Sequence, residues 1–346
     1  MQLFNTIYGR NLVGELPRIL GRPYVVVSMD DLWPMFADSF DDSLVGPHLV
    51  RTLELEELEH LVRDEIPHCE AVVGLGGGQA IDVAKFIAWR RRLPLFQVPT
   101  ALSVNAPFGH RTAVRTDGVV RYIGWIVPEA VFVDFDVIQG APLLLNRSGV
   151  ADVFCYHTAR FDWELAERAG RVEAKWRYDA QWAQRATDVL DSVLAALDDV
   201  RDCTEHGIRT LMEALRWGGA AFANAGWNPR PIEGAEHFFF YALEHLTRKH
   251  FIHGQPVGLG ILLVSALQGN EPDRIRAALD AVGVPYQPED MGITWDDAAA
   301  ALADMPAAVE RGGLWYTIAS ERLVDDEFVE KARAWLATPG GRWADG

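Results

Sequence analysis

The sequence predicts an N-terminal α/β domain with a Rossmann-like parallel sheet over residues 1–140, followed by an all-α domain over residues 141–346. In the first part, short apolar runs alternate with segments of helical periodicity. Such alternation is typical of a parallel sheet covered by helices on both faces. From about Leu144 onward, the long periodic segments are helical and are separated by turn residues.

Within the first domain, apolar runs predict strands over residues 24–30, 48–53, 70–75, 93–99 and 130–138. Helical spacing of apolar residues predicts helices over residues 55–66 and 79–92. In the second domain, the same spacing predicts helices over residues 150–169, 178–200, 205–226, 234–250 and 255–268.

Composition narrows the classes of partner. The formal net charge of −17 argues against nucleic acid and against an anionic membrane surface, since both require a cationic face. The cysteines Cys69, Cys155 and Cys203 form no C-x-x-C pair, which fits a reducing compartment. No apolar run reaches the ~18 residues of a spanning helix. We expect a cytoplasmic protein without membrane insertion that acts on a small molecule as a homo-oligomer.

The segment AVVGLGGGQAIDVAKF contains a glycine-rich turn, Gly76, Gly77 and Gly78, between a predicted strand and a predicted helix. Glycines allow the backbone to approach a phosphate, and a helix N-terminus presents free N–H groups and the positive end of its dipole. The turn therefore predicts a pyrophosphate site. The pattern is neither G-x-G-x-x-G nor a Walker sequence, so a tight turn without a ligand stays open as the alternative.

This turn and the later VPTALS segment resemble the dehydroquinate synthase and iron-containing alcohol dehydrogenase superfamily. Members bind a nicotinamide dinucleotide on a GGGS-x-x-D-x-A-K turn and a PT-x-x-S segment. Further segments match in order. GVADVFCYHTARFDWELA resembles the first metal-ligand helix, and EGAEHFFFYAL resembles the SGSEH…HAL segment of the sn-glycerol-1-phosphate dehydrogenases. IHGQPVGLGILL resembles their HG-x-x-VG-x-G segment, and LWYTIASERLVDDEF resembles their YTI segment.

The resemblance implies a dehydroquinate synthase-like fold and a cofactor site. The implied cofactor-binding residues are Gly76, Gly77, Gly78, Asp82, Thr100 and Ser103. For Asp82, a simple interaction with the helix dipole is the alternative. An acidic residue at the end of the strand 24–30, Asp30 or Asp31, would accept the adenosine ribose hydroxyls and repel a 2′-phosphate. We therefore expect NAD, with NADP possible; the alternative is that these aspartates cap the following helix.

The resemblance also implies that Asp152, His237 and His253 bind one divalent metal. One carboxylate and two imidazoles are a usual catalytic set for zinc or ferrous iron, with nickel also possible. Any one of these histidines, taken alone, is more often an ordinary core or surface residue. The implied reaction is hydride transfer between a small polyol or polyol phosphate and the nicotinamide, while the metal lowers the pKa of the reacting hydroxyl.

Two positions depart from the family pattern. Glycerol dehydrogenases carry an aspartate where SVNAPFG has Asn105, whose amide can bind a hydroxyl but cannot act as a base. Arg111 falls at a lysine that contacts substrate in dehydroquinate synthases. A sugar-phosphate cyclase-like lyase using bound NAD is therefore the alternative function. Against it, the cyclases have Glu as the first metal ligand in A-E-V-x-K, whereas this chain has ADVFCY with Asp152.

Two cationic clusters could receive an anionic substrate group. One is His110 with Arg111, and the other is Arg248, Lys249 and His250 just before His253. Arginine suits a phosphate because its fork donates two hydrogen bonds. The alternatives are a surface ion pair for Arg111 and a solvated helix end for the second cluster.

Overall fold

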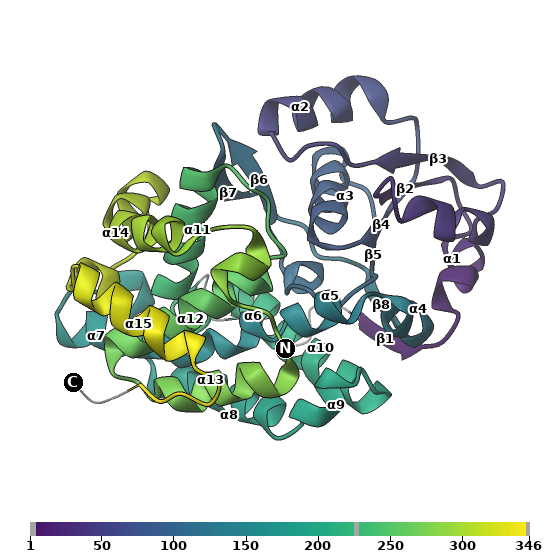
Figure 1. Cartoon of the computed structure of the whole chain (residues 1–346). Coiled ribbons are helices and arrows are strands. Elements are labelled where there is room, and N and C mark those ends of the chain that lie inside the picture. Colours follow the sequence, from purple (N-terminus) through teal and green to yellow (C-terminus); the bar gives the residue numbers. More distant parts are fainter. Residues whose placement is uncertain (1–4, 225–227, 344–346) are drawn as a thin grey trace. The chain divides into compact units, whose positions relative to one another are not determined.

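The computed structural model describes residues 5–224 and 228–343 of the chain (Figure 1). The chain divides into two compact units. The first holds the residues up to Asn146 together with Cys203–Ala220, and the second holds Arg147–Asp202 together with the residues after Ala220. The domain boundary at residues 140/141 stays a prediction.

The first unit contains a six-stranded sheet in the order β1-β8-β5-β4-β2-β3, with all described pairings parallel. The strands are β1 (Asn5–Gly9), β2 (Tyr24–Ser28), β3 (Leu44–Leu49), β4 (Ala71–Gly76), β5 (Leu95–Pro99) and β8 (Ala130–Asp134). The helices of this part of the chain are α1 (Leu12–Leu20), α2 (Leu55–His60), α3 (Gly78–Arg91), α4 (Phe135–Gly140) and α5 (Leu143–Ser148).

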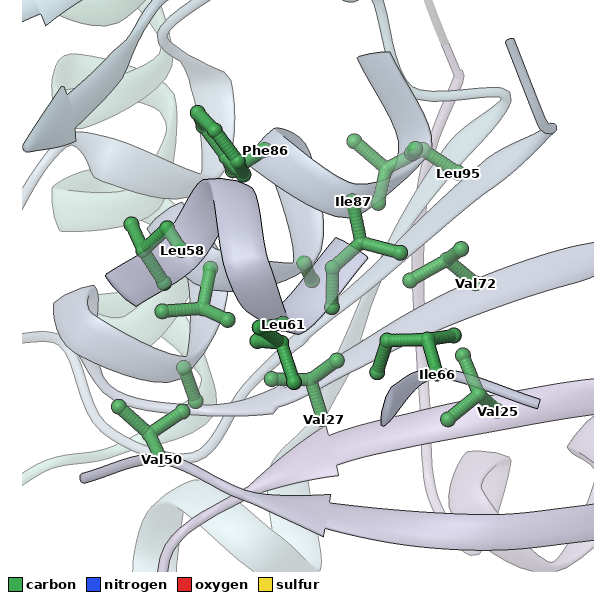
Figure 2. Packing of buried hydrophobic residues seen from close by; sticks show 14 of the residues in the cluster. Val25, Val27, Val50, Leu58, Leu61, Ile66, Val72, Phe86, Ile87 and Leu95 are labelled. Carbon is green, nitrogen blue, oxygen red and sulfur yellow. The ribbon is translucent and has the colours of Figure 1, made fainter. Parts of the chain in front are cut away.

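Alternating side chains of the strands build two cores, one on each face of the sheet. Val25, Val27 and Val72 pack with residues of α2 and α3 such as Leu58 and Phe86 (Figure 2). On the opposite face, Val26 and Val73 pack with α1. Strands buried on both faces must be apolar at consecutive positions. This explains why the continuous apolar runs in the sequence predict these strands.

Several predicted elements end or begin elsewhere. The strand predicted over residues 48–53 is instead β3, Leu44–Leu49, at the edge of the sheet. Its Pro47 breaks the apolar pattern and is tolerated because an edge strand leaves some N–H positions unpaired. The strand predicted over residues 130–138 ends at Asp134, whose side chain accepts from the backbone N–H of Asp136 and so caps α4. The helix predicted over residues 55–66 continues after His60 as a π-type turn, Leu61–Glu65.

A two-stranded antiparallel hairpin, β6 (Thr112–Thr116) and β7 (Val119–Ile123), lies outside the sequence prediction. Its two-residue turn is Asp117–Gly118, with φ of 53° and 74°. Positive φ at both positions is what a tight hairpin turn requires, and Asp-Gly is a strong signal for it. The hairpin was therefore readable from the sequence.

In the second unit, the regular elements that the structure describes are helical. They are α6 (Ala151–Phe154), α7 (Tyr156–Arg168), α8 (Ala180–Leu194), α9 (Leu197–Arg201), α11 (Ala235–Thr247), α12 (Gly254–Gln268), α13 (Pro272–Val282), α14 (Trp295–Gly312) and α15 (Asp326–Ala337). The helices predicted over residues 150–169 and 178–200 are each divided in two, as α6 with α7 and α8 with α9. Helix α10 (Glu205–Asn224) has residues in both units. It was predicted to extend to residue 226, and residues 225 and 226 lie outside the described part of the chain.

Among the described helices, none combines the length and the apolar character needed to cross a membrane.

Candidate metal and nucleotide sites

The glycine-rich turn lies where the sequence places it, between the end of β4 and the start of α3. Gly76 has φ of 156°, and a Cβ there would lie 2.8 Å from the Cβ of Ala80, so only glycine fits. A Cβ on Gly77 would meet no described atom within 4 Å. The turn is thus open on the side of Gly77, directly before the free N–H groups of α3.

The strand order places this turn at a topological switch point. The strand after β2 lies on one side of it, at β3, whereas the strand after β4 lies on the other side, at β5. In open α/β sheets, ligands bind at the carboxyl ends of the strands at such a point. Asp30 and Asp31 follow the end of β2 and are exposed. A Cβ on Gly76 would come within 4.0 Å of the Met29 side chain, so the two strand ends lie close together.

The PT-x-x-S segment lies beside the turn. The backbone N–H of Thr100 donates to the Gly76 carbonyl over 3.2 Å, and Thr100 is buried while Ser103 is partly exposed. The short 3-10 turn after Asp31 begins at Trp33, and in this described segment no side chain caps its start. The capping role considered for Asp30 and Asp31 is therefore not seen.

Asp82 belongs to a buried network inside the first unit. Its carboxylate lies 2.6 Å from Lys85 Nζ, and both side chains are buried. Lys85 Nζ also donates to the carbonyls of Ala106, Gly109 and Arg111, over 3.1, 3.4 and 2.6 Å. Burial raises the pKa of Asp82, and the charge of Lys85 opposes that rise. This ion pair holds the loop that follows the PT-x-x-S segment.

The same loop carries Asn105, His110 and Arg111. Asn105 is partly exposed. Arg111 is exposed, and its guanidinium donates to the Tyr122 carbonyl over 3.1 Å. His110 is buried, and burial together with the charge of Lys85 lowers the pKa of His110 to about 4. At neutral pH His110 is therefore uncharged, and Arg111 is the cation of this pair.

The implied metal ligands converge within the second unit. Asp152 lies on α6, His237 on the first turn of α11, and His253 directly before α12. One ligand atom from each residue can be chosen so that all three lie within 4.8 Å of one another. His253 Nε2 is 3.0 Å from Asp152 Oδ1, and His237 Nε2 is 4.0 Å from the same oxygen. Asp152 and His237 are buried.

Glycines explain how three segments so distant in sequence come together. A Cβ on Gly254 would lie 1.9 Å from the Ser148 carbonyl oxygen, so the start of α12 touches the backbone just before α6. A Cβ on Gly260 would lie 2.6 Å from the Glu236 carbonyl oxygen, so α12 also lies directly against α11. Both glycines belong to the HG-x-x-VG-x-G segment. Their close backbone contacts set the spacing of the ligand cluster.

Two buried carboxylates beside the cluster were missed by the sequence reasoning. Glu236 Oε1 lies 2.9 Å from His237 Nδ1, and Glu233 accepts a 2.8 Å hydrogen bond from the Tyr241 hydroxyl. Burial alone would lower the pKa of His237, but the bond to Glu236 and the charges of Glu233, Glu236 and Asp152 raise it to about 9. Acidic residues within the apolar segment EGAEHFFF were the available signal.

This donor set suits a divalent cation. One carboxylate and two imidazoles at this spacing match a catalytic zinc or ferrous site, and the surrounding carboxylates favour positive charge. The second cationic cluster lies at the surface. Arg248, Lys249 and His250 are exposed at the end of α11, and Lys249 Nζ donates to the Gly292 carbonyl. Arg248 ends the helix in the left-handed conformation.

Known proteins resemble the chain at the level of sequence and of fold. The model of the iron-containing alcohol dehydrogenase family matches residues 29–142. A glycerol-1-phosphate dehydrogenase (NAD(P)+) of Aeropyrum pernix is 33% identical over 294 residues, which cover 83% of this chain and 79% of the relative. The corresponding protein of Thermofilum pendens is 37% identical over 234 residues, covering 67% of this chain and 66% of that relative.

The structure of a probable glycerol dehydrogenase from Sinorhizobium meliloti superposes with a TM-score of 0.71 at 20% identity, covering 96% of this chain and 97% of that chain. This likeness confirms the predicted fold class. The sequence matches confirm the family that the motifs indicated. The chain belongs to the iron-containing alcohol dehydrogenase family, alongside the glycerol-1-phosphate dehydrogenases that it resembles in sequence.

Proposed function

We propose that Asp152, His237 and His253 bind one divalent metal and that the protein interconverts glycerol 1-phosphate and dihydroxyacetone phosphate with NAD(P). Family membership makes the chain a metal-dependent, NAD(P)-linked dehydrogenase of a small polyol or polyol phosphate, as the sequence predicted. The observation that carries the proposal is the convergence of the three ligand side chains within 4.8 Å. The choice of glycerol 1-phosphate follows the names of the relatives.

Different residues of the chain would hold the metal and the dinucleotide. A divalent ion held by Asp152, His237 and His253 would supply the Lewis acidity that lowers the pKa of a substrate hydroxyl, and a bound nicotinamide would supply the hydride chemistry. Asp152 contributes negative charge, while His237 presents Nε2 because its Nδ1 faces Glu236. Gly77 and the first turn of α3 would hold the pyrophosphate through backbone N–H groups. Thr100 borders that turn, and Ser103 follows three residues later in the same segment.

The choice of metal, of dinucleotide and of substrate contacts rests on the chemistry of the residues. Zinc and ferrous iron both suit this ligand set, and nickel is a third candidate. We propose NAD as the preferred dinucleotide because Asp30 and Asp31 lie exposed at the end of β2. Arg111 is the candidate contact for the substrate phosphate, with Asn105 on the same loop as the candidate contact for a hydroxyl. The homo-oligomeric state and the cytoplasmic location stay predictions.

We prefer dehydrogenase chemistry to the cyclase-like alternative because the named relatives are dehydrogenases and the first ligand is Asp152. The test is a substrate screen that follows NADH and NADPH absorbance. The metal-free protein is reloaded with zinc or ferrous iron and supplied with dihydroxyacetone phosphate, dihydroxyacetone or a short aldehyde. We expect turnover to be fastest with dihydroxyacetone phosphate. Equal turnover of dihydroxyacetone would contradict the assigned substrate, and no turnover with either metal would contradict the proposed activity.

A further inference from the structure

We propose that Glu236, held by Thr158, is a positioning residue that fixes the ring of His237 and strengthens its bond to the metal. The proposal rests on the metal site described under the proposed function. It concerns a carboxylate that is not itself among the ligands Asp152, His237 and His253. Glu236 and Thr158 are both fully buried, so their polar atoms contact protein groups rather than water.

The carboxylate of Glu236 is fixed through both oxygens. Its Oε1 accepts the backbone N–H of Gly234 over 2.7 Å and lies 2.9 Å from His237 Nδ1. Its Oε2 accepts the hydroxyl of Thr158, which lies on α7, over 2.7 Å. The two ends of the carboxylate are thus anchored on different elements. Rotation of the group would break at least one of these charge-assisted bonds.

This geometry determines which ring nitrogen of His237 can bind a metal. An ionised carboxylate only accepts hydrogen bonds, so Nδ1 must carry the proton that points at Oε1. The lone pair then lies on Nε2, the atom that faces Asp152. A carboxylate in this position also makes the imidazole a better donor to a metal. Glu236 therefore fixes the tautomer, the orientation and the electron density of this ligand.

The space around Glu236 leaves little freedom for another arrangement. A Cβ on Gly234 would lie 2.9 Å from Glu236 Oε2 and 2.8 Å from Asp162 Oδ2, so glycine is required where both carboxylates approach the start of α11. Asp162 accepts the N–H of Ala235 over 2.9 Å and that of Ile318 over 2.9 Å. Asp162 thus anchors the same helix end, and among the described residues its side chain makes no hydrogen bond to His237, which makes it a matched control.

The test compares the zinc dissociation constants of full-length variants, measured by chelator competition on metal-free protein at one fixed pH. Glu236→Gln keeps the volume. Its amide oxygen can accept from Gly234 and His237, and its amide nitrogen can donate to Thr158, whose hydroxyl can turn to the Cys155 carbonyl 3.0 Å away. The variant therefore removes the charge and preserves the packing. We expect zinc binding to weaken by about 10- to 100-fold.

Two further variants separate positioning from general damage. Thr158→Val removes the bond to Oε2 but leaves the charge, and we expect zinc binding to weaken by about fivefold, the value of one hydrogen bond. Asp162→Asn should lower the melting temperature of the metal-free protein and leave zinc affinity within about twofold of wild type. Cobalt-substituted protein provides a second readout, because its visible spectrum should change in Glu236→Gln and not in Asp162→Asn.

The outcomes distinguish failure of the positioning role of Glu236 from failure of the proposed metal site. If wild-type protein binds no zinc, the proposed function fails. If wild-type protein binds zinc and Glu236→Gln binds it equally well, the positioning role alone is wrong. It is also wrong if Asp162→Asn weakens zinc binding as much as Glu236→Gln does. Should Glu236→Gln fail to fold, Thr158→Val decides, and an unchanged affinity in that variant overturns the proposal.

Discussion

Two buried clusters of charge, one in each unit, have opposite chemistry. In the first unit, Asp82 pairs with Lys85 at 2.6 Å, and the ammonium also binds the carbonyls of the neighbouring loop. In the second unit, the negative charge of Asp152 faces the imidazoles of His237 and His253. The first cluster is an ion pair between two side chains that also anchors a loop, whereas the second offers three ligand atoms at metal spacing.

The difference teaches how to distinguish a structural acid from a functional one. A buried carboxylate requires a compensating partner. At Asp82 that partner is Lys85 of the same chain. The motif D-x-x-K therefore holds the loop that follows the PT-x-x-S segment. At Asp152 a divalent ion would complete the compensation. We therefore expect damage to the first cluster to lower stability, and damage to the second to abolish metal binding and catalysis.

The largest effect is expected from Asp152→Asn. The change keeps the shape of the side chain and removes the negative charge that we propose binds the metal. We expect kcat/KM to fall by about 1,000-fold or more, equivalent to about 4 kcal/mol, since a catalytic metal supplies several kcal/mol. Steady-state kinetics with metal analysis of the same sample measure it.

His245→Gln is the matched control for a ligand histidine, because His245 lies two turns beyond His237 on the same helix and outside the ligand group. It should retain both metal and activity. Full activity in Asp152→Asn would show that this cluster is not the catalytic centre.

The next effect concerns the other cluster. Lys85→Met leaves Asp82 buried without its cation, and breaking a buried pair in this way costs about 3–5 kcal/mol. We expect the free energy of unfolding in urea to fall by that amount, while zinc affinity stays unchanged. The double variant Asp82→Asn with Lys85→Met should recover part of the loss. A stable Lys85→Met protein that has lost zinc binding would reverse the roles assigned to the two clusters.

A smaller effect is expected at the loop that Lys85 holds. Arg111→Met keeps much of the stem and removes the guanidinium fork. If Arg111 binds the substrate phosphate, kcat/KM for dihydroxyacetone phosphate should fall by about 10- to 100-fold, at about 1.4 kcal/mol per tenfold. Activity on an uncharged polyol should change little. Equal losses on both substrates would assign Arg111 to the cofactor or to the loop, through its bond to Tyr122.

The smallest effect is expected at the end of β2. Acidic residues at this position favour the free ribose hydroxyls of NAD over the 2′-phosphate of NADP. We expect wild-type protein to bind NAD at least tenfold more tightly, about 1.4 kcal/mol, and Asp30→Asn with Asp31→Asn to narrow that difference. Fluorescence titration with both dinucleotides measures it. Equal affinities in wild-type protein would show that these aspartates do not contact the ribose.

The sequence predicted the sheet well wherever a strand is buried on both faces, because continuous apolar runs report such strands directly. It failed where that signal is weak. The edge strand β3 contains Pro47, and β1 is short and lies at the other edge. The hairpin of β6 and β7 is marked by the Asp-Gly turn rather than by its short strands. The two misses within the six-stranded sheet lie at its edges, where packing places few demands on the sequence.

The candidate nucleotide site was easier to predict from the sequence than the candidate metal site. The nucleotide turn is local, so strand, glycines and helix predict it without knowledge of the fold. The metal cluster joins Asp152, His237 and His253, which only tertiary packing brings together, and only family resemblance indicated it. Glu236 was missed although an acidic residue in an apolar segment was a signal, and Thr158 was missed because a contact between two helices leaves no periodic pattern. Asp82 was expected near the cofactor. Its ion pair with Lys85 was missed, although the i,i+3 spacing on a helix makes the two side chains neighbours.

The most direct test of the central claim is anomalous diffraction from a crystal of the protein grown with zinc or ferrous iron and NAD. We predict one anomalous peak per chain, about 2.0–2.2 Å from Asp152 Oδ1, His237 Nε2 and His253 Nε2. Data from Asp152→Asn crystals should show that peak lost or strongly reduced. A fully occupied ion elsewhere in the chain, with these three side chains bound to none, would contradict the account.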